Sequence, residues 1–457
     1  MKKDDNVITK AVEAPAELLE KTIEVTEEVN HALHGDKTAQ RTRDYWHTLG
    51  PGLTTGASDD DPSGIATYSQ TGAQYGFQLL WLAPFTFPLM AVVQEMCARI
   101  GLVTGRGLAS NIRTKYSHRA LYFCAMLLFA ANTFNIGADL GAMSKSVELL
   151  FPSWNFILLV VGITIVMLWL QIFTPYKRYA KYLKWLSLVL LAYVVSAFLA
   201  HLNWSHVLSH AFVPSISFNK NQLLLICAIL GTTISPYLFF WQTSQEVEDQ
   251  IVQGKTTIQM RQDSTTPKDV HSMRVDVWSG MFLSNIAMFF IVAACGGLLF
   301  THGVTNIQTA SQAAQALRPF AGSATYFLFA LGIIGLGMLA IPVLAGPSSC
   351  AISESLNQRG SLGMKLKQAY AFYGVIIISM VVGLCMNFIG INPIKALIYA
   401  AVLNGLVAPV VLIYIVLLSS NRKIMGNWVN GRWSTIIGWL NVGIMAVSGL
   451  AAIYSLL

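Results

Sequence analysis

The sequence predicts an all-α, polytopic membrane protein. Only 12% of its 457 residues are charged and 54% are hydrophobic, whereas soluble domains carry about 25% charged residues. Residues 155–174 and 281–300 contain no charged side chain, and each run has the roughly 20 residues that a helix needs to cross a bilayer. Two other apolar runs are interrupted by proline and polar residues, which indicates broken helices within the membrane.

Apolar segments follow one another along the chain from residue 53 to its end. Turn-forming residues separate many of them, such as Pro51-Gly52 before the first and Pro152 after the third. Residues 1–50 are polar, and we expect them to form a cytosolic N-terminal extension of a transmembrane domain at 51–457. The eleven predicted spans are 53–80, 82–102, 121–149, 155–174, 183–202, 222–244, 277–302, 324–350, 369–389, 393–418 and 434–457.

The basic residues are distributed unevenly between the two sides of these spans. Of the 30 Lys and Arg residues, all but four lie on the side of the N-terminus. Because basic loops stay in the cytoplasm, the N-terminus is predicted to be cytoplasmic and the C-terminus outside. We expect the membrane to be the plasma membrane. The four basic residues on the other side are Lys145, Lys220, Arg318 and Lys395. This uneven distribution explains the net charge of +7 without a nucleic-acid partner.

The interrupted spans are the first and the sixth, and each opens a series of five. This order predicts two inverted repeats, at about 51–202 and 222–420, with the span at 434–457 outside them. Paired interrupted helices mark the central site of secondary transporters. The HExxH, GxSxG and Walker A motifs and Cys/His metal clusters are absent from the sequence. We therefore expect a monomeric transporter in the lipid bilayer, not an enzyme, with no cofactor.

The first interruption contains three adjacent carboxylates followed by Pro62 and Gly64. Asp61 directly precedes the proline, where its carboxylate and freed backbone carbonyls would converge on a cation. Hard oxygen ligands suit Mg²⁺, Ca²⁺ and Mn²⁺. The structural alternative is that Asp61 only caps the following half-helix. Asp59 and Asp60 lie on other helix faces, and we expect them to line a vestibule or to cap locally.

The second interruption, at residues 231–237, contributes only oxygen. Ser235 and Tyr237 bring hydroxyl groups, and Thr232 and Thr233 bring carbonyls if the helix opens at Pro236. Soft sulfur or imidazole ligands, which favour transition metals, are absent from this segment. A plain Ser-Pro kink in a packed helix is the alternative.

Other polar residues within the spans are weaker candidates. Gln70 could face the same cavity as Asp61 or bond a neighbouring helix. Asp139, in the third span, is a buried acid with either an electrostatic or a structural role. Glu95 and Arg99 have the i,i+4 spacing of an ion pair. The remaining acids, Asp276, Glu246, Glu248 and Asp249, are expected at an interface or on a solvated face.

From about residue 50 to 426 the chain resembles the Nramp (natural-resistance-associated macrophage protein) family of divalent-metal transporters. The residues Asp61-Pro62-Ser63-Gly64, followed by Gln70, stand at the family's Asp-Pro-Gly-Asn motif and its downstream Gln. Residues 98–105 (ARIGLVTG) also resemble the family, and Ser235-Pro236-Tyr237 stands at its Met-Pro-His motif. The resemblance implies a LeuT-like fold of two inverted five-helix repeats plus an eleventh helix, a central metal site and import into the cytoplasm.

The departures from the family pattern concern the metal ligands and the proton route. Gly64 replaces a ligating Asn, Ser235 replaces the Met whose sulfur favours Mn²⁺ and Fe²⁺, and Tyr237 replaces a His. The ninth span lacks the family's Arg, whereas Asp139 stands at its acidic position in the third span. This pattern resembles the divergent Nramp-related magnesium transporters.

We therefore predict a divalent-cation importer with Mg²⁺ as the main substrate and Mn²⁺ as a second one. A largely hydrated Mg²⁺, which sheds water reluctantly, would enter along the membrane potential without proton coupling. The nearest alternative is a proton-coupled Mn²⁺/Fe²⁺ symporter. An amino-acid transporter and a membrane-embedded enzyme or sensor are more remote. The predicted metal positions are Asp61, Gly64, Thr232 and Ser235, and the surrounding ones are Gln70, Tyr237, Thr233 and Asp139.

Overall fold

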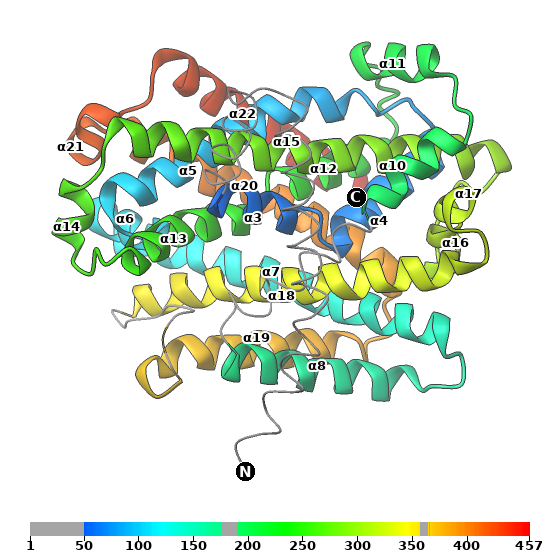
Figure 1. Cartoon of the computed structure of the whole chain (residues 1–457), viewed down its shortest axis with the longest axis horizontal. Coiled ribbons are helices and arrows are strands. Elements are labelled where there is room, and N and C mark those ends of the chain that lie inside the picture. The colour runs from blue at the N-terminus through cyan, green and yellow to red at the C-terminus, as the bar shows by residue number, and fades with distance from the viewer. Residues whose placement is uncertain (1–49, 175–189, 357–363, 365) are drawn as a thin grey trace, which may run out of the picture. The chain divides into compact units, whose positions relative to one another are not determined.

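The computed structural model describes residues 50–174, 190–356, 364 and 366–457. The described part of the chain is helical throughout, without a strand. Most of the long helices run parallel or antiparallel to one another, along the horizontal direction of Figure 1. The N-terminal extension predicted at 1–50 lies outside the described residues except for Gly50, and residues 183–189 of the fifth predicted span also lie outside them.

A helix or a pair of helices lies at each of the eleven predicted spans, and eight of the described helical segments are long and apolar enough to cross a membrane. The fifth and ninth spans appear as shorter apolar helices, α10 (Leu190–Leu199) and α19 (Tyr370–Met386). The other unbroken span helices are α5 (Leu82–Thr104), α7 (His118–Leu150), α8 (Phe156–Phe173), α15 (Pro267–Leu298), α18 (Thr325–Ser355), α20 (Pro393–Ser419) and α22 (Arg432–Leu456). Short helices connect them: α6 (Leu108–Lys115), α11 (Trp204–Phe212), α14 (Ile258–Asp263), α16 (Ala310–Ala314), α17 (Arg318–Ala321) and α21 (Arg422–Met425).

Both predicted helix interruptions are present. The first span consists of α3 (Pro51–Asp59) and α4 (Pro62–Tyr75), and the sixth of α12 (Lys220–Thr233) and α13 (Pro236–Val252). In each case the second half-helix begins at a proline, because proline lacks an N–H and its fixed φ suits the first helical position. The broken pair α3 and α4 lies among the longer helices (Figure 1).

Glycines allow the broken first span to pack closely on α15. A Cβ atom at Gly56 would lie 2.2 Å from the carbonyl oxygen of Gly280, and one at Gly72 would lie 2.5 Å from that of Val292. Gly52 meets the same helix at Val277. Small residues at a spacing of four are typical of close helix packing in membranes. This seam holds the interruption between α3 and α4 against α15.

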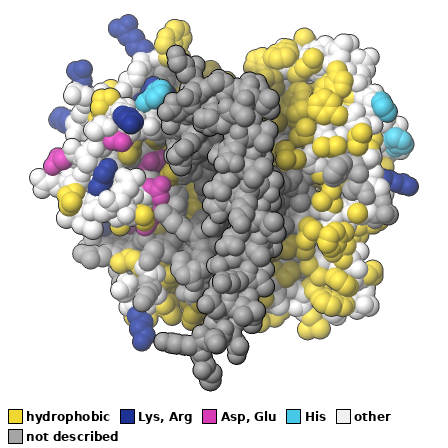
Figure 2. Space-filling view, viewed as in Figure 1, with side chains coloured by type: hydrophobic (Ala, Val, Ile, Leu, Met, Phe, Trp, Pro, Cys, Tyr) yellow, Lys and Arg dark blue, Asp and Glu magenta, His cyan; other side chains and the backbone are white. Residues whose placement is uncertain are grey.

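Most of the Lys, Arg, Asp and Glu side chains visible in Figure 2 lie at its left end, near α6, α14 and α21, and apolar side chains are prominent on the right half. Of the acids expected at an interface or on a solvated face, Asp276 and Glu246 are buried. Asp276 is 1% exposed and Glu246 is 6% exposed, so the expectation of a solvated face is wrong for Glu246. Asp276 is buried because α15 begins at Pro267, before the predicted start at 277, and its first turns bond α3 and α5. Glu246 is buried because it packs against α5 at Gly101.

Candidate functional site

Asp61 occupies the gap between α3 and α4 and is 1% exposed. Its Oδ1 accepts hydrogen bonds from the backbone N–H of Gly64 and from the hydroxyl of Ser63, both at 2.7 Å. Its Oδ2 accepts from the amide of Asn135 at 3.0 Å and from the hydroxyl of Tyr237 at 3.4 Å. The residue is the N-cap of α4, as the structural alternative proposed, and its carboxylate also contacts two other spans.

The two interruptions contact each other through side chains. Tyr237, in the first turn of α13, donates to Asp61 beside the first interruption. Thr232, at the end of α12, donates its hydroxyl to the phenol oxygen of Tyr68 on α4 at 3.0 Å. A carboxylate, two phenols and a threonine hydroxyl therefore join α4 and its N-cap to α12 and α13 in the interior of the protein.

Ser235 closes the carbonyl end of α12. Its hydroxyl donates to the carbonyl oxygens of Gly231 at 2.8 Å and Thr232 at 2.6 Å, which would otherwise lack partners at a helix end. Each carbonyl oxygen has a second lone pair, so Thr232 retains one for another partner. The hydroxyl of Thr233 instead donates to its own helix, to Ile229 at 2.9 Å.

The remaining predicted site residues have different surroundings. The Gln70 side chain accepts from the backbone N–H of Ile307 at 2.8 Å and donates to the carbonyl of Thr305 at 3.3 Å. It therefore fastens α4 to the segment after α15. Asp139 is fully buried within electrostatic reach of Asp61, and neither of its carboxylate oxygens has a hydrogen-bond partner among the described residues.

Two residues of the site, Asn135 and Tyr68, were not among the sequence-predicted candidates. Asn135 lies on α7 one turn before Asp139 and is fully buried. The sequence could have indicated Asn135, because it is an amide inside an apolar span on the same helix face as a buried acid, and such amides form hydrogen bonds between helices. The sequence does not indicate Tyr68 in this way, because tyrosines are common packing residues in membrane helices.

Space around the site is limited. A cavity of about 10 Å³ beside α4 is lined by Pro62, Ile65 and apolar residues of α7, α18 and α20, which is about enough for one water molecule. A Cβ atom at Gly64 would only touch its neighbours, at 3.4 Å or more. Asp61, Thr232 and Ser235 are at most 1% exposed. The structure thus describes a closed arrangement, and a hydrated ion would need the half-helices to separate.

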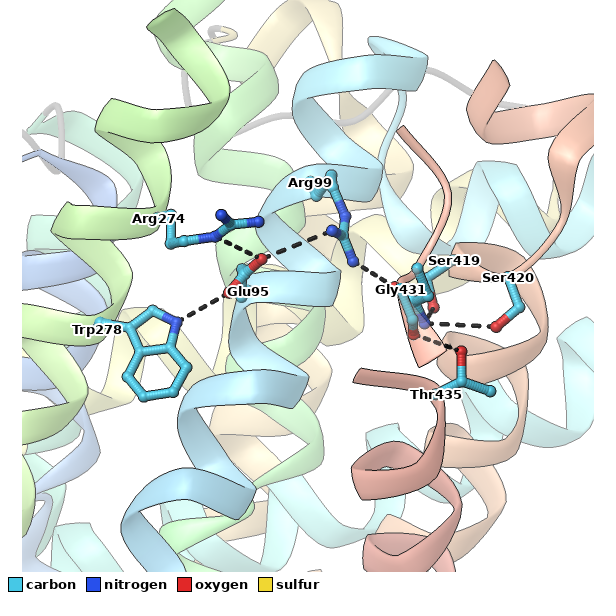
Figure 3. Close-up of polar contacts among 9 residues, drawn as sticks. Glu95, Arg99, Arg274, Trp278, Ser419, Ser420, Gly431 and Thr435 are labelled. Carbon is cyan, nitrogen blue, oxygen red and sulfur yellow. Dashed lines mark hydrogen bonds and ion pairs between the residues drawn. The ribbon is translucent and has the colours of Figure 1, made fainter. Parts of the chain in front are cut away.

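The ion pair predicted between Glu95 and Arg99 is present at 3.6 Å (Figure 3). Glu95 also accepts from the guanidinium of Arg274 at 3.0 Å and from the indole of Trp278 at 2.8 Å, both on α15. Arg99 donates in addition to Asn430, in the segment between α20 and α22. This cluster is centred on α5. It joins α5 to α15 and to the segment between α20 and α22.

Comparisons with known proteins identify the family of the chain. Residues 52–455 match the Nramp family, described as natural resistance-associated macrophage protein-like. The divalent metal cation transporter MntH of Aeromonas hydrophila is 24% identical over 414 residues, which cover 87% of this chain and 93% of the relative. That of Bacillus subtilis is 24% identical over 401 residues, with 86% and 88% covered.

Solved structures with the same fold include two groups of transporters. The manganese transporter of Eremococcus coleocola superposes with a TM-score of 0.71 at 19% identity, covering 92% of this chain and 88% of that one. The nucleobase-cation-symport-1 transporter Mhp1 superposes with a TM-score of 0.53 at 13% identity, covering 89% and 91%. The fold is therefore the LeuT-like one, and the chain, matched along nearly all of its membrane domain, belongs to the Nramp family.

Proposed function

We propose that this protein is a divalent-cation transporter whose main substrate is Mg²⁺, with Mn²⁺ as a second substrate. The observation that supports it is the chemistry where the two interruptions meet. Asp61 is surrounded there by Ser63, Asn135 and Tyr237 and lies near the end of α12. These groups are oxygen and nitrogen donors without thioether or imidazole, and hard oxygen ligands favour Mg²⁺.

In this proposal the metal positions are Asp61, Gly64, Thr232 and Ser235, and the ion keeps most of its water. The carboxylate of Asp61 would supply the charge, and the free lone pair on the carbonyl of Thr232 would accept a hydrogen bond from a metal-bound water. Gly64, which has no side chain, and the small side chain of Ser235 leave room for that water once the half-helices separate. Tyr237, Gln70, Thr233 and Asp139 would act around the hydrated ion.

The driving force in this proposal is the membrane potential. A divalent ion gains about 4.6 kcal/mol per 100 mV of inside-negative potential, twice the value for a single charge, which corresponds to about a 2000-fold gradient. Import then needs no proton coupling. The ninth span, α19, supplies no arginine or histidine for a proton route.

The orientation that we propose places the N-terminus in the cytoplasm of the cell and the membrane domain in its plasma membrane. The gathering of Lys and Arg at the end near α6, α14 and α21 (Figure 2) supports it, because basic loops remain cytoplasmic. A cysteine introduced at exposed Ser153 should react with an impermeant maleimide in intact cells, and one at exposed Thr256 should not. The reverse labelling would invert this orientation.

The primary test is Mg²⁺ uptake into proteoliposomes whose voltage is clamped with potassium and an ionophore. Wild-type protein should take up Mg²⁺ faster as the inside becomes more negative, and Asp61→Ala should abolish uptake because it removes the central carboxylate. Glu148→Gln is the matched control, since that acid forms a partly exposed ion pair with Lys145. Wild-type vesicles without Mg²⁺ or Mn²⁺ uptake would refute the proposal.

The second candidate is a proton-coupled Mn²⁺/Fe²⁺ symporter, which the names of the relatives favour. Ser235→Met should strengthen Mn²⁺ binding and weaken Mg²⁺ uptake, because it adds a soft sulfur where the family has one. Ser235→Ala, which removes the hydroxyl without adding sulfur, is the control. Stoichiometric acidification of the lumen during Mn²⁺ uptake by wild type would favour the symporter.

A further inference from the structure

The end of α3 carries two further acids, Asp59 and Asp60. They are 0% and 2% exposed. The hydroxyl of Ser284 on α15 donates to Oδ2 of Asp59 and also interacts with Asp60. The position follows from the glycine seam, because Gly56 meets Gly280 one turn before Asp60 and Ser284. Neither acid is on a solvated vestibule.

These two carboxylates differ from Asp61 in their hydrogen bonding. Both oxygens of Asp61 accept bonds from protein donors. In the described part of the chain, Oδ1 of Asp59 and Oδ1 of Asp60 have no hydrogen-bond partner, and neither residue takes part in a described ion pair. Among the three adjacent acids at 59–61, the oxygens without a hydrogen-bond partner therefore belong to the two acids nearer to α3.

Electrostatics favours a cation at these oxygens. A buried carboxylate without partners is strongly disfavoured, and two adjacent ones repel each other. They also lie at the C-terminal end of α3, where the helix dipole is negative and attracts positive charge. A cation bound there would satisfy the free oxygens and offset the repulsion.

We propose that Asp59, Asp60 and Ser284 form a second divalent-cation site, next to Asp61 on the side of α3. The ligand class is a hard divalent ion such as Mg²⁺ or Mn²⁺, since the donors are two carboxylates and a hydroxyl. No group of three Asp, Glu, His or Cys in the described residues is arranged to hold a metal. The ion would accordingly keep several waters, as Mg²⁺ bound by one or two carboxylates does.

The surrounding acids give this site a place on the ion's route, an assignment that rests on the proposed transport function. Asp276, on the same helix as Ser284, is 1% exposed and accepts from the backbone N–H of Gly52 at 2.6 Å. Glu246 on α13 lies within electrostatic reach of Asp276. Buried acids thus follow the α3–α15 seam from Asp61 toward the start of α3. Counted from Asp61, the second site is the first cation position along this seam.

The test counts bound ions on the purified full-length protein by Mn²⁺ electron paramagnetic resonance. Wild type should bind two Mn²⁺ per chain, and Mg²⁺ should displace both. The isosteric double variant Asp59→Asn/Asp60→Asn should bind one, and Asp61→Asn should also retain one. Glu148→Gln, which removes a partly exposed acid, should bind two. If the double variant binds as many ions as wild type with unchanged affinity, the second site does not exist.

Further controls separate a loss of folding, or a failure of the transport proposal, from the absence of the second site. If the double variant melts well below wild type, Asp60→Asn alone replaces it, because it leaves the bond between Ser284 and Asp59 intact. That variant should weaken the second binding step at least tenfold, and an unchanged step would overturn the proposal. A single wild-type ion that survives the double variant and disappears in Asp61→Asn overturns the second site but not transport. Wild type that binds no divalent ion overturns both.

Discussion

Asp61 is both the N-cap of a half-helix and the proposed centre of the metal site. Its Oδ1 accepts bonds from Ser63 and Gly64 within its own turn, and its Oδ2 accepts bonds from Asn135 and Tyr237 on other helices. The local bonds hold the carboxylate in place, and the distant ones orient it toward the second interruption. Such outer partners tune the affinity of a ligand for a metal.

The first prediction concerns Asn135. Asn135→Ala should weaken Mg²⁺ and Mn²⁺ binding by about 10- to 100-fold, the usual effect of losing an orienting partner of a ligand. The measurement is a binding isotherm on purified protein. Asn132→Ala is the control, because this neighbouring buried amide bonds Leu344 and Ser348 on α18 instead. Equal loss of affinity in both variants would contradict an orienting role.

At the scale of elements, the decisive contact is the glycine seam between the broken first span and α15. Gly52, Gly56 and Gly72 allow backbone contact on both sides of the interruption. Since α3 has only nine residues, it has little packing surface of its own, and its position depends on this contact. Any movement of α3 away from α15 would have to break these glycine contacts. We therefore expect the half-helices to separate along this seam.

The second prediction is that Gly56→Ala destabilises the protein by about 1–3 kcal/mol, the usual cost of overpacking. The added methyl group would meet the backbone of Gly280 at 2.2 Å. Gly443→Ala in α22 is the matched control, because a Cβ atom there meets nothing within 4 Å and alanine favours helix. The measurement is thermal unfolding in detergent. Equal melting temperatures for Gly56→Ala and wild type would show that α3 and α15 can move apart to accommodate the added methyl group without loss of stability.

At the scale of the whole molecule, the cluster around Glu95 joins distant parts of the chain (Figure 3). Glu95 and Arg99 on α5 have side chains that are 8% and 6% exposed. Arg274 and Trp278 attach α15 to them, and Asn430 attaches the segment before α22. The eleventh span is thereby linked to the helices that carry the site.

The third prediction compares a buried with a partly exposed ion pair. Glu95→Gln should cost about 3–5 kcal/mol of stability, because it leaves the buried charge of Arg99 without a carboxylate. Glu148→Gln should cost less than about 1 kcal/mol, since the side chains of its pair with Lys145 are 30% and 39% exposed and solvent screens them. Thermal unfolding of both variants measures the difference. Similar melting temperatures would mean that Arg99 is satisfied by Asn430 alone.

Much of the fold was predictable, because bilayer thickness sets the length of each span and proline ends a half-helix. The spans, both interruptions and the pair of Glu95 with Arg99 follow from such local rules. The donors to Asp61 were only partly predictable. Ser63 and Gly64 are neighbours in the sequence, but Asn135 is 74 residues away, and its choice of partner depends on how α7 packs.

The sequence by itself determined the class of the protein, the number of its spans and where two helices break, because these depend on hydropathy, charge and proline along a short stretch. Only the tertiary structure decided which side chains meet at those breaks and which acids are buried. Contacts such as Tyr68 with Thr232, or Ser284 with Asp59, join residues far apart in the chain. Their formation depends on close packing of helices around glycine, which no local pattern encodes.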